Sequence, residues 1–198
     1  LIAVQPTDDS PEAHQTAGVL NRYLRSIYQR LLNHPLNKDR KRGGRPPVNI
    51  LATQRPGRRR PLDPFFERWG LRGLSIAAGP LYWGLCQELG MDVIKVEESG
   101  DRENDLRERL LRARDEREYD FIHVHTKVPD EAGHTKDPRH KQEVIEALDR
   151  AMGWAVEHIA GDPETLLVVT ADHSTPSAGS MIHAGEAVPL TMVGRYPR

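Results

Sequence analysis

The fold is decided by an apolar run that ends abruptly in polar residues, LLVVTADH at residues 166–173. Its first five residues are uncharged and rich in leucine and valine, which is typical of a strand. The preceding segment, 138–159, carries apolar residues at helical spacing, namely Val144, Ile145, Leu148, Met152, Val156 and Ile159. A long amphipathic helix therefore leads into a strand.

The same alternation continues toward the N-terminus. We expect helices near 64–69, 80–89 and 101–117, strands near 74–77, 93–96 and 121–128, and one more strand at 188–190. Strands that alternate with helices imply an α/β fold, with a mostly parallel sheet flanked by helices on both faces. In such sheets ligands gather at the carboxyl ends of the strands.

The first 60 residues have a different composition. Ser10-Pro11 predicts a helix start, because the hydroxyl can cap the first turn and proline lacks the N–H that would go unpaired there. That helix should end near Pro35. From Lys38 to Arg60 nine lysines or arginines accompany one acid, so we expect a turn-rich basic loop with a short strand at 48–51. Residues 1–4 are apolar and predict an interior strand.

Bulk composition excludes several classes of protein. The 198 residues carry a formal net charge of -1, so no global field favours nucleic acid, and no apolar run is long enough for a bilayer. The single cysteine, Cys86, fits a reducing compartment. We therefore expect a cytoplasmic protein that binds neither nucleic acid nor membrane. The missing initiator Met and the abrupt end lead us to expect a piece of a longer chain.

A polar cluster follows the strand expected at 121–128. Asp130 and His134 form a D-x-x-x-H pair, and Gly133 should let a turn fold the two side chains together. Carboxylate and imidazole ligands suit zinc, manganese or iron better than calcium. This pair is a candidate for metal binding.

A second cluster follows the strand at 166–170. Asp172 and His173 are adjacent at its end, and His183 lies on the next loop. Neighbours on a loop can reach one metal, or one can orient the other. Clusters at neighbouring strand ends make a two-metal site geometrically natural.

Simpler explanations exist for each residue alone. A strand-end Asp or His is often a helix cap or a surface residue, and nine histidines make chance pairs inevitable. The joint placement of three clusters after apolar strands favours a metal site. His123 and His125 project from one face of their strand, where we expect them to pack or to support the ligands.

Residues 120–134, DFIHVHTKVPDEAGH, resemble the metal-ligand segment of archaeal-type cofactor-independent phosphoglycerate mutases, a family of the alkaline phosphatase superfamily. TADHSTP at 170–176 and HAGEAVP at 183–189 resemble that family's next two ligand segments. The resemblance covers nearly the whole chain. It implies a partial alkaline-phosphatase-like core.

The resemblance also implies how the ligands are shared. Asp130, His134 and His183 would hold one cation, and Asp172 and His173 the other. The cofactors would be two divalent metal ions, with manganese, zinc or magnesium as the candidates. The family's serine or threonine nucleophile lies N-terminal to this region, and we find no candidate segment for it here.

The chain's division into domains is a further implication. Residues 1–68 would be part of an inserted substrate-binding domain, and 69–198 the C-terminal half of the metal-binding catalytic core. Arg40 and Arg55 align best with arginines that grip the phosphate and carboxylate of the substrate. A solvated loop is the simpler explanation for Arg58, Arg59 and Arg60.

Two positions depart from the family pattern. Trp83 stands where a lysine usually precedes Gly84, and 135–138 reads TKDP where an acidic, glycine-containing stretch is usual. A lysine lost near bound phosphate would weaken mutase specificity and leave the metal chemistry intact.

The leading hypothesis is a metal-dependent phosphotransferase, mutase-like, acting on a small phosphorylated carboxylate. The alternatives are a phosphatase or phosphonate hydrolase of the same superfamily, and a non-catalytic metal-binding module. Without its nucleophile segment this piece should catalyse little. A sheet lacking N-terminal strands would also expose an edge through which a homo-oligomer could form.

Overall fold

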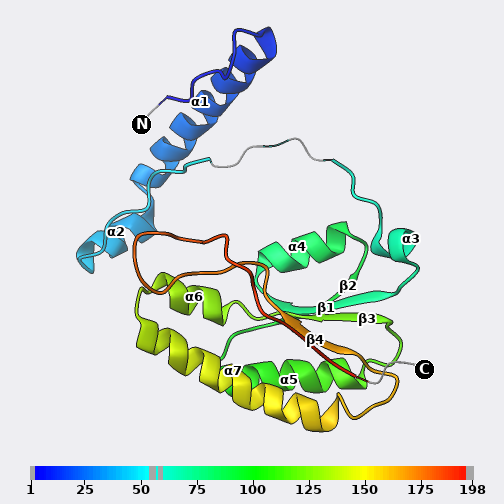
Figure 1. Ribbon diagram of the computed structural model, residues 1–198. Coiled ribbons are helices and arrows are strands. Elements are labelled where there is room, and N and C mark those ends of the chain that lie inside the picture. Colours follow the sequence, from blue (N-terminus) through cyan, green and yellow to red (C-terminus); the bar gives the residue numbers. More distant parts are fainter. Residues whose placement is uncertain (1–2, 54–56, 58–59, 195–198) are drawn as a thin grey trace. The chain divides into compact units, whose positions relative to one another are not determined.

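The computed structural model describes residues 3–53, 57 and 60–194. It divides into two compact units, Leu1–Arg60 and Pro61–Arg198, whose elements are labelled in Figure 1. The assignment of residues 1–68 to a substrate-binding domain stays a prediction. In the described part of the chain, no helix combines the length and apolarity needed to cross a bilayer.

The first unit begins with the long helix α1, Pro11–Leu32. Its start is capped as predicted, because the Ser10 hydroxyl accepts a hydrogen bond from the Ala13 amide at 3.2 Å. Its end before Pro35 is also confirmed. The strand expected at the N-terminus is wrong for the residues that can be described: Val4 instead exchanges two hydrogen bonds of 2.9 Å with the Asn21 side chain.

The start of the basic segment is a helix, α2 (Pro35–Arg42), where we expected a loop. The start of this highly charged helix is stabilised by proline at its first position and by the His34 ring, which accepts a hydrogen bond from the Leu36 amide. The strand expected at 48–51 is wrong too. The buried Asn37 side chain bonds both the amide and the carbonyl of Val48 at 2.8 Å, so these groups are not available to a partner strand.

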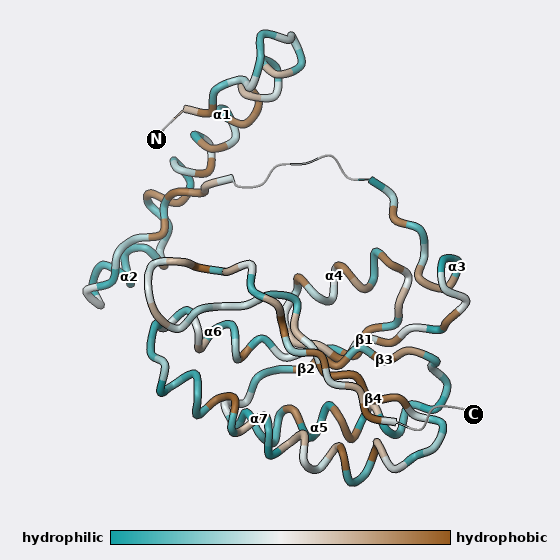
Figure 2. Tube along the Cα trace, viewed as in Figure 1, coloured by the Kyte–Doolittle hydropathy of each residue, from teal (hydrophilic) through white to brown (hydrophobic). Residues whose placement is uncertain are grey.

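The second unit is built on a three-stranded parallel sheet of order β2-β1-β3. The strands are β1 (Gly73–Ala78), β2 (Asp92–Val96) and β3 (Phe121–Val124). Leu74, Ser75, Ile76 and Ala77 of the central strand are buried, and Figure 2 shows this strand among the more hydrophobic parts of the chain. Burial on both faces is the usual condition of a parallel strand.

Helices cover both faces of this sheet, as predicted (Figure 1). The short α3 (Phe65–Trp69) precedes β1, and α4 (Pro80–Glu88) packs on β1 and β2. On the opposite face lie α5 (Arg102–Asp115) and α7 (Pro138–His158), which pack on each other. Their shared core consists of Leu106, Leu110, Ala151, Ala155 and Ile159.

The end of the chain departs from the prediction. β4 (Leu167–Thr170) and β5 (Leu190–Val193) pair with each other, antiparallel, as a separate two-stranded sheet. We expected both to enter the parallel sheet. Val168, Val169, Leu190 and Met192 remain exposed on this pair, so the apolar pattern that predicted these strands did not specify their partner.

Candidate metal centre

The first pair of candidate ligands lies on helix α6, Val128–His134. The strand predicted over 121–128 begins where expected and is shorter, and the turn predicted after it is wrong. β3 ends at Val124, and Pro129 then occupies the first turn of a helix, where it is favoured. Because residues four apart share one face of a helix, Asp130 and His134 meet, with Nε2 of His134 at 3.1 Å from Oδ1 of Asp130.

Gly133 has a different role from the one predicted. It is helical, so no turn requires it, but a side chain there would collide with the neighbouring loop. A Cβ at this position would lie 2.8 Å from both Cγ2 and the carbonyl oxygen of Thr175. Gly133 therefore allows close approach between α6 and the segment that carries the other ligands.

That segment, residues 171–189 between β4 and β5, is called the ligand loop below. Asp172 and His173 follow β4 directly, with Oδ2 and Nε2 3.6 Å apart. The bridge between Ser174 and Ala184 brings the two arms of the loop together and places His183 beside His173. The two imidazole centroids are 4.0 Å apart.

Asp130 is the point at which the two segments meet. His183 Nε2 lies 3.4 Å from Oδ1 of Asp130, on the same oxygen that faces His134. Polar ligand atoms of Asp130, His173 and His183 also lie within 4.8 Å of one another. Asp172 stands at the margin, with a side chain 69% exposed. The five predicted metal ligands thus gather in one place, and carboxylate and imidazole donors in this number fit a transition metal.

The carboxyl group of Asp130 is kept ionised in this setting. Burial acts to raise its pKa, but the hydrogen bond from Thr175 and the nearby His134 and Lys127 outweigh burial, and the net shift is downward. Lys127 Nζ lies 3.9 Å from Oδ2 and is half exposed. An ionised carboxylate is the form that binds a cation.

Residues that the sequence reasoning missed hold the ligand loop. Lys136 Nζ donates to the carbonyls of Pro176 (2.8 Å) and Met181 (2.6 Å), and Lys141 Nζ donates to that of Thr175 (2.5 Å). Lys136 has a φ of 59°, a left-handed conformation that is uncommon outside glycine and asparagine. The unusual TKDP stretch thus includes a residue that fixes the loop, a role with no sequence signal.

His123 in β3 and His125 just after it have partners other than the candidate ligands. His123 Nδ1 lies 3.0 Å from the Ser75 hydroxyl, and the His125 ring lies against Tyr82 at a centroid distance of 3.6 Å. Burial, reinforced by His123, lowers the pKa of His125 from 6.5 to about 4. Burial, together with the charges of Asp172 and Asp130, raises the pKa of Tyr82.

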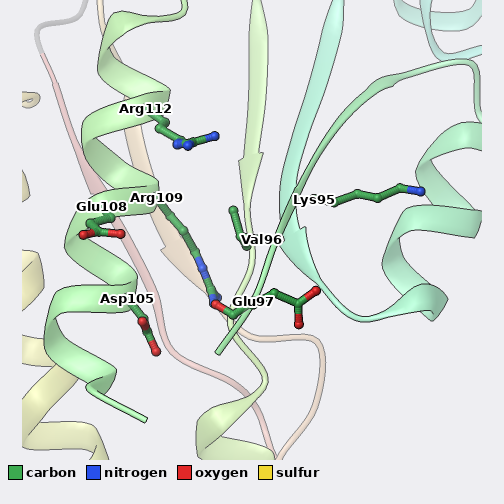
Figure 3. Close-up of a pocket in the computed structure, with 7 residues that line it drawn as sticks. All are labelled: Lys95, Val96, Glu97, Asp105, Glu108, Arg109 and Arg112. Atoms are coloured by element: carbon green, nitrogen blue, oxygen red, sulfur yellow. The ribbon is translucent and has the colours of Figure 1, made fainter. Parts of the chain in front are cut away.

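Arg109 of α5 holds the segment between β3 and α6. Its side chain is 2% exposed, donates to the His125 carbonyl at 2.8 Å and pairs with Glu98 at 2.9 Å. Figure 3 shows it reaching toward Glu97, and both residues line a cavity of about 270 Å³. None of the candidate ligands lines that cavity. Its charged lining consists of three basic and three acidic side chains, namely Lys95, Arg109, Arg112, Glu97, Asp105 and Glu108.

The remaining predicted positions are less informative. Arg40 Nε donates to the Pro46 carbonyl at 2.8 Å within the first unit, and Arg55 lies outside the described residues. Trp83 donates from Nε1 to the Ala77 carbonyl, and Lys95 Nζ lies 5.1 Å from its ring centroid. The substrate-binding roles stay predictions.

The sheet and the gathered carboxylate and imidazole donors are those expected of an α/β metalloprotein. The sequence profile of the Metalloenzyme superfamily matches residues 15–198. The chain belongs to that superfamily.

Individual relatives are more specific. The chain is 41% identical, over 94% of its length, to a 2,3-bisphosphoglycerate-independent phosphoglycerate mutase of Methanocaldococcus jannaschii, and 39% identical, over 96%, to one of Methanopyrus kandleri. It covers 41% and 45% of these proteins, so it spans less than half the length of the curated relatives it matches. The resemblance predicted from the ligand segments is confirmed.

Solved structures agree on the fold. A protein structure from Pyrococcus horikoshii matches with a TM-score of 0.74 and 29% identity, over 93% of this chain and 49% of that one. A cofactor-independent phosphoglycerate mutase from Thermoplasma acidophilum matches with a TM-score of 0.55 and 30% identity, over 98% of this chain and 45% of that one.

Proposed function

We propose that this chain forms the metal-holding half of a phosphoglycerate mutase-like phosphotransferase that uses two divalent cations. The observation that carries the proposal is the convergence on Asp130 of histidines from two separate segments. Its Oδ1 faces His134 at 3.1 Å and His183 at 3.4 Å. These three side chains would hold one cation, and Asp172 with His173 the other.

The chemistry follows from the charges involved. Bound cations would neutralise the charge of a transferring phosphoryl group. Asp130 supplies an ionised carboxylate, because the hydrogen bond from Thr175 and the nearby His134 and Lys127 outweigh burial and lower its pKa. His134, His173 and His183 supply ring nitrogens. Mixed carboxylate and imidazole donors favour manganese or zinc over magnesium.

The substrate would be a small phosphorylated carboxylate. This rests on the mutase activity named for the Methanocaldococcus jannaschii and Methanopyrus kandleri relatives, and on the suitability of Arg40 and Arg55 for phosphate and carboxylate. Lys127, half exposed beside Asp130, adds a positive charge next to the candidate metal ligands. A cytoplasmic location, the absence of nucleic-acid partners and homo-oligomer formation stay predictions.

A chimera tests the activity directly. Residues 15–198 would replace the matching part of the Methanocaldococcus jannaschii relative, and the purified chimera would be supplied with Mn²⁺ and 3-phosphoglycerate. We expect 2-phosphoglycerate to form. The matched controls are His134→Ala, which should abolish turnover, and His158→Ala, an exposed histidine at the end of α7 that should leave it intact.

Two results would contradict the proposal. A folded, metal-loaded chimera that releases inorganic phosphate in place of the isomer would support the phosphatase alternative. The sequence feature that favours this alternative is Trp83, which stands where the family usually has a lysine. A chimera that binds metal and leaves every phosphoester intact would support a non-catalytic module.

A further inference from the structure

Thr175 stands between the two groups of candidate ligands. It lies on the ligand loop, two residues after His173, and is only 4% exposed. Its hydroxyl oxygen is 2.7 Å from Oδ1 of Asp130 and 3.2 Å from Nδ1 of His173. One buried hydroxyl therefore touches a member of each proposed ligand set.

The direction of these two hydrogen bonds can be derived. An ionised carboxylate only accepts, so the single hydroxyl proton of Thr175 goes to Asp130. The hydroxyl then has only lone pairs left for His173, so Nδ1 of that ring must donate. A neutral imidazole protonated at Nδ1 has its lone pair on Nε2. This is the nitrogen that lies 3.6 Å from Oδ2 of Asp172.

The backbone of Thr175 is fixed independently of its hydroxyl. Lys141 of α7 donates to the Thr175 carbonyl at 2.5 Å. On the other side, the missing side chain of Gly133 leaves room for the Thr175 methyl group and carbonyl. The hydroxyl is therefore held in place before any cation binds, which reduces the ordering required at binding.

We propose that Thr175 is a positioning residue that couples the two proposed ligand sets. It orients Asp130, and it fixes His173 in the tautomer whose Nε2 is free to bind a cation. This rests on the ligand roles proposed above. Partners of this kind, which orient a metal ligand through its other nitrogen, typically contribute about 10- to 100-fold to metal affinity.

The test reads the tautomer of His173 in the metal-free chain. Nitrogen-15 spectra of the histidine rings would be recorded at a pH where they are neutral, with His173 assigned through His173→Gln. We expect Nδ1 protonation in the wild type and in Thr175→Ser, which keeps the hydroxyl. Thr175→Val, which keeps the shape, should lose this preference. The wild-type spectrum decides the tautomer even if Thr175→Val does not fold.

Zn²⁺ titration of the same variants gives a second readout. Thr175→Val should bind Zn²⁺ about 10- to 100-fold more weakly, Thr175→Ser should stay within about 3-fold of the wild type, and Thr191→Val, an exposed threonine of β5, should match it. Protonation of wild-type His173 on Nε2, or unchanged affinity in Thr175→Val, overturns the proposal. Neither readout depends on mutase activity, so a failure of the proposed function would leave these results standing.

Discussion

The two halves of the candidate metal centre are held by different kinds of structure. Asp130 and His134 sit on one face of α6, where backbone hydrogen bonds of the helix set their spacing. Asp172, His173 and His183 sit on the ligand loop, which beyond its single bridge has no regular ladder. That loop is held by side chains from α6, α7 and the turn between them.

The difference concerns where the geometry is encoded. The spacing of Asp130 and His134 is set within α6 itself, whereas the loop half depends on contacts 34 to 45 residues away, such as those of Lys141 and Lys136. Segments held by few tertiary contacts open at lower free energy than the elements they join. The ligand loop should therefore unfold locally at a lower free energy than α6.

Removing Asp130, the α6 residue that also contacts the ligand loop, should have the largest effect on metal affinity. Asp130→Ala deletes the carboxylate that faces His134, His183 and Thr175. We expect Mn²⁺ affinity, measured by isothermal titration calorimetry, to fall more than about 100-fold, because even residues behind the ligands contribute 10- to 100-fold. Glu131→Ala, an exposed neighbour on the same helix, should leave affinity unchanged. Equal affinity in the two variants would mean that Asp130 is not a ligand.

Separating the two halves while keeping all ligands is the next largest change. Gly133→Ala places a methyl group 2.8 Å from the Thr175 carbonyl, which should force the loop away and cost about 1–3 kcal/mol of unfolding free energy. Gly153→Ala in α7 meets nothing within 4 Å and should instead stabilise by about 0.5–1 kcal/mol. Urea denaturation of both variants measures this. A destabilised Gly153→Ala, or a neutral Gly133→Ala, would show that close approach is not what Gly133 provides.

Loosening the loop alone should cost less. Lys141→Met removes the charged donor to the Thr175 carbonyl, with an expected loss of about 1.5 kcal/mol. Hydrogen exchange should quicken in the ligand loop and stay slow in α6. Lys38→Met, an exposed lysine of the first unit, serves as the control. Loss of protection in α6 to the same extent as in the loop would remove the distinction between the two halves.

A pH dependence of stability is expected at His125, which lies between β3 and α6. Burial lowers the pKa of His125 from 6.5 to about 4, so between these values the unfolded chain binds a proton that the folded chain excludes. The free energy of unfolding should therefore fall as pH drops from 6.5 toward 4. His125→Phe keeps a ring against Tyr82 and should flatten this slope, while His14→Phe should not. Identical slopes in both variants would assign the pH dependence to other groups.

The sequence predicted those elements whose signals are local. Ser10-Pro11 located the start of α1, and the apolar spacing of residues 144–159 located α7. The five candidate ligands were also identifiable, because Asp and His after apolar strands form an unusual joint pattern, and the structure does gather them.

Tertiary contacts explain what was missed. Helix α6 is too short to show periodicity, so Gly133 suggested a turn when its actual role is contact with Thr175. Lysine at 136 gives no sign of a left-handed backbone or of a loop contact. The apolar pattern of β4 predicts a strand and cannot specify β5 as its antiparallel partner.

Anomalous diffraction from crystals soaked in Zn²⁺, recorded at the zinc edge, tests the ligand assignment most directly. We predict a peak about 2.0–2.2 Å from Asp130, His134 and His183, with a second, weaker peak beside Asp172 and His173. The structure offers a specific competitor, because ligand atoms of Asp130, His173 and His183 also lie within 4.8 Å of one another. A single peak bound by those three residues, with His134 turned away, would contradict the proposed division of the five ligands between two cations.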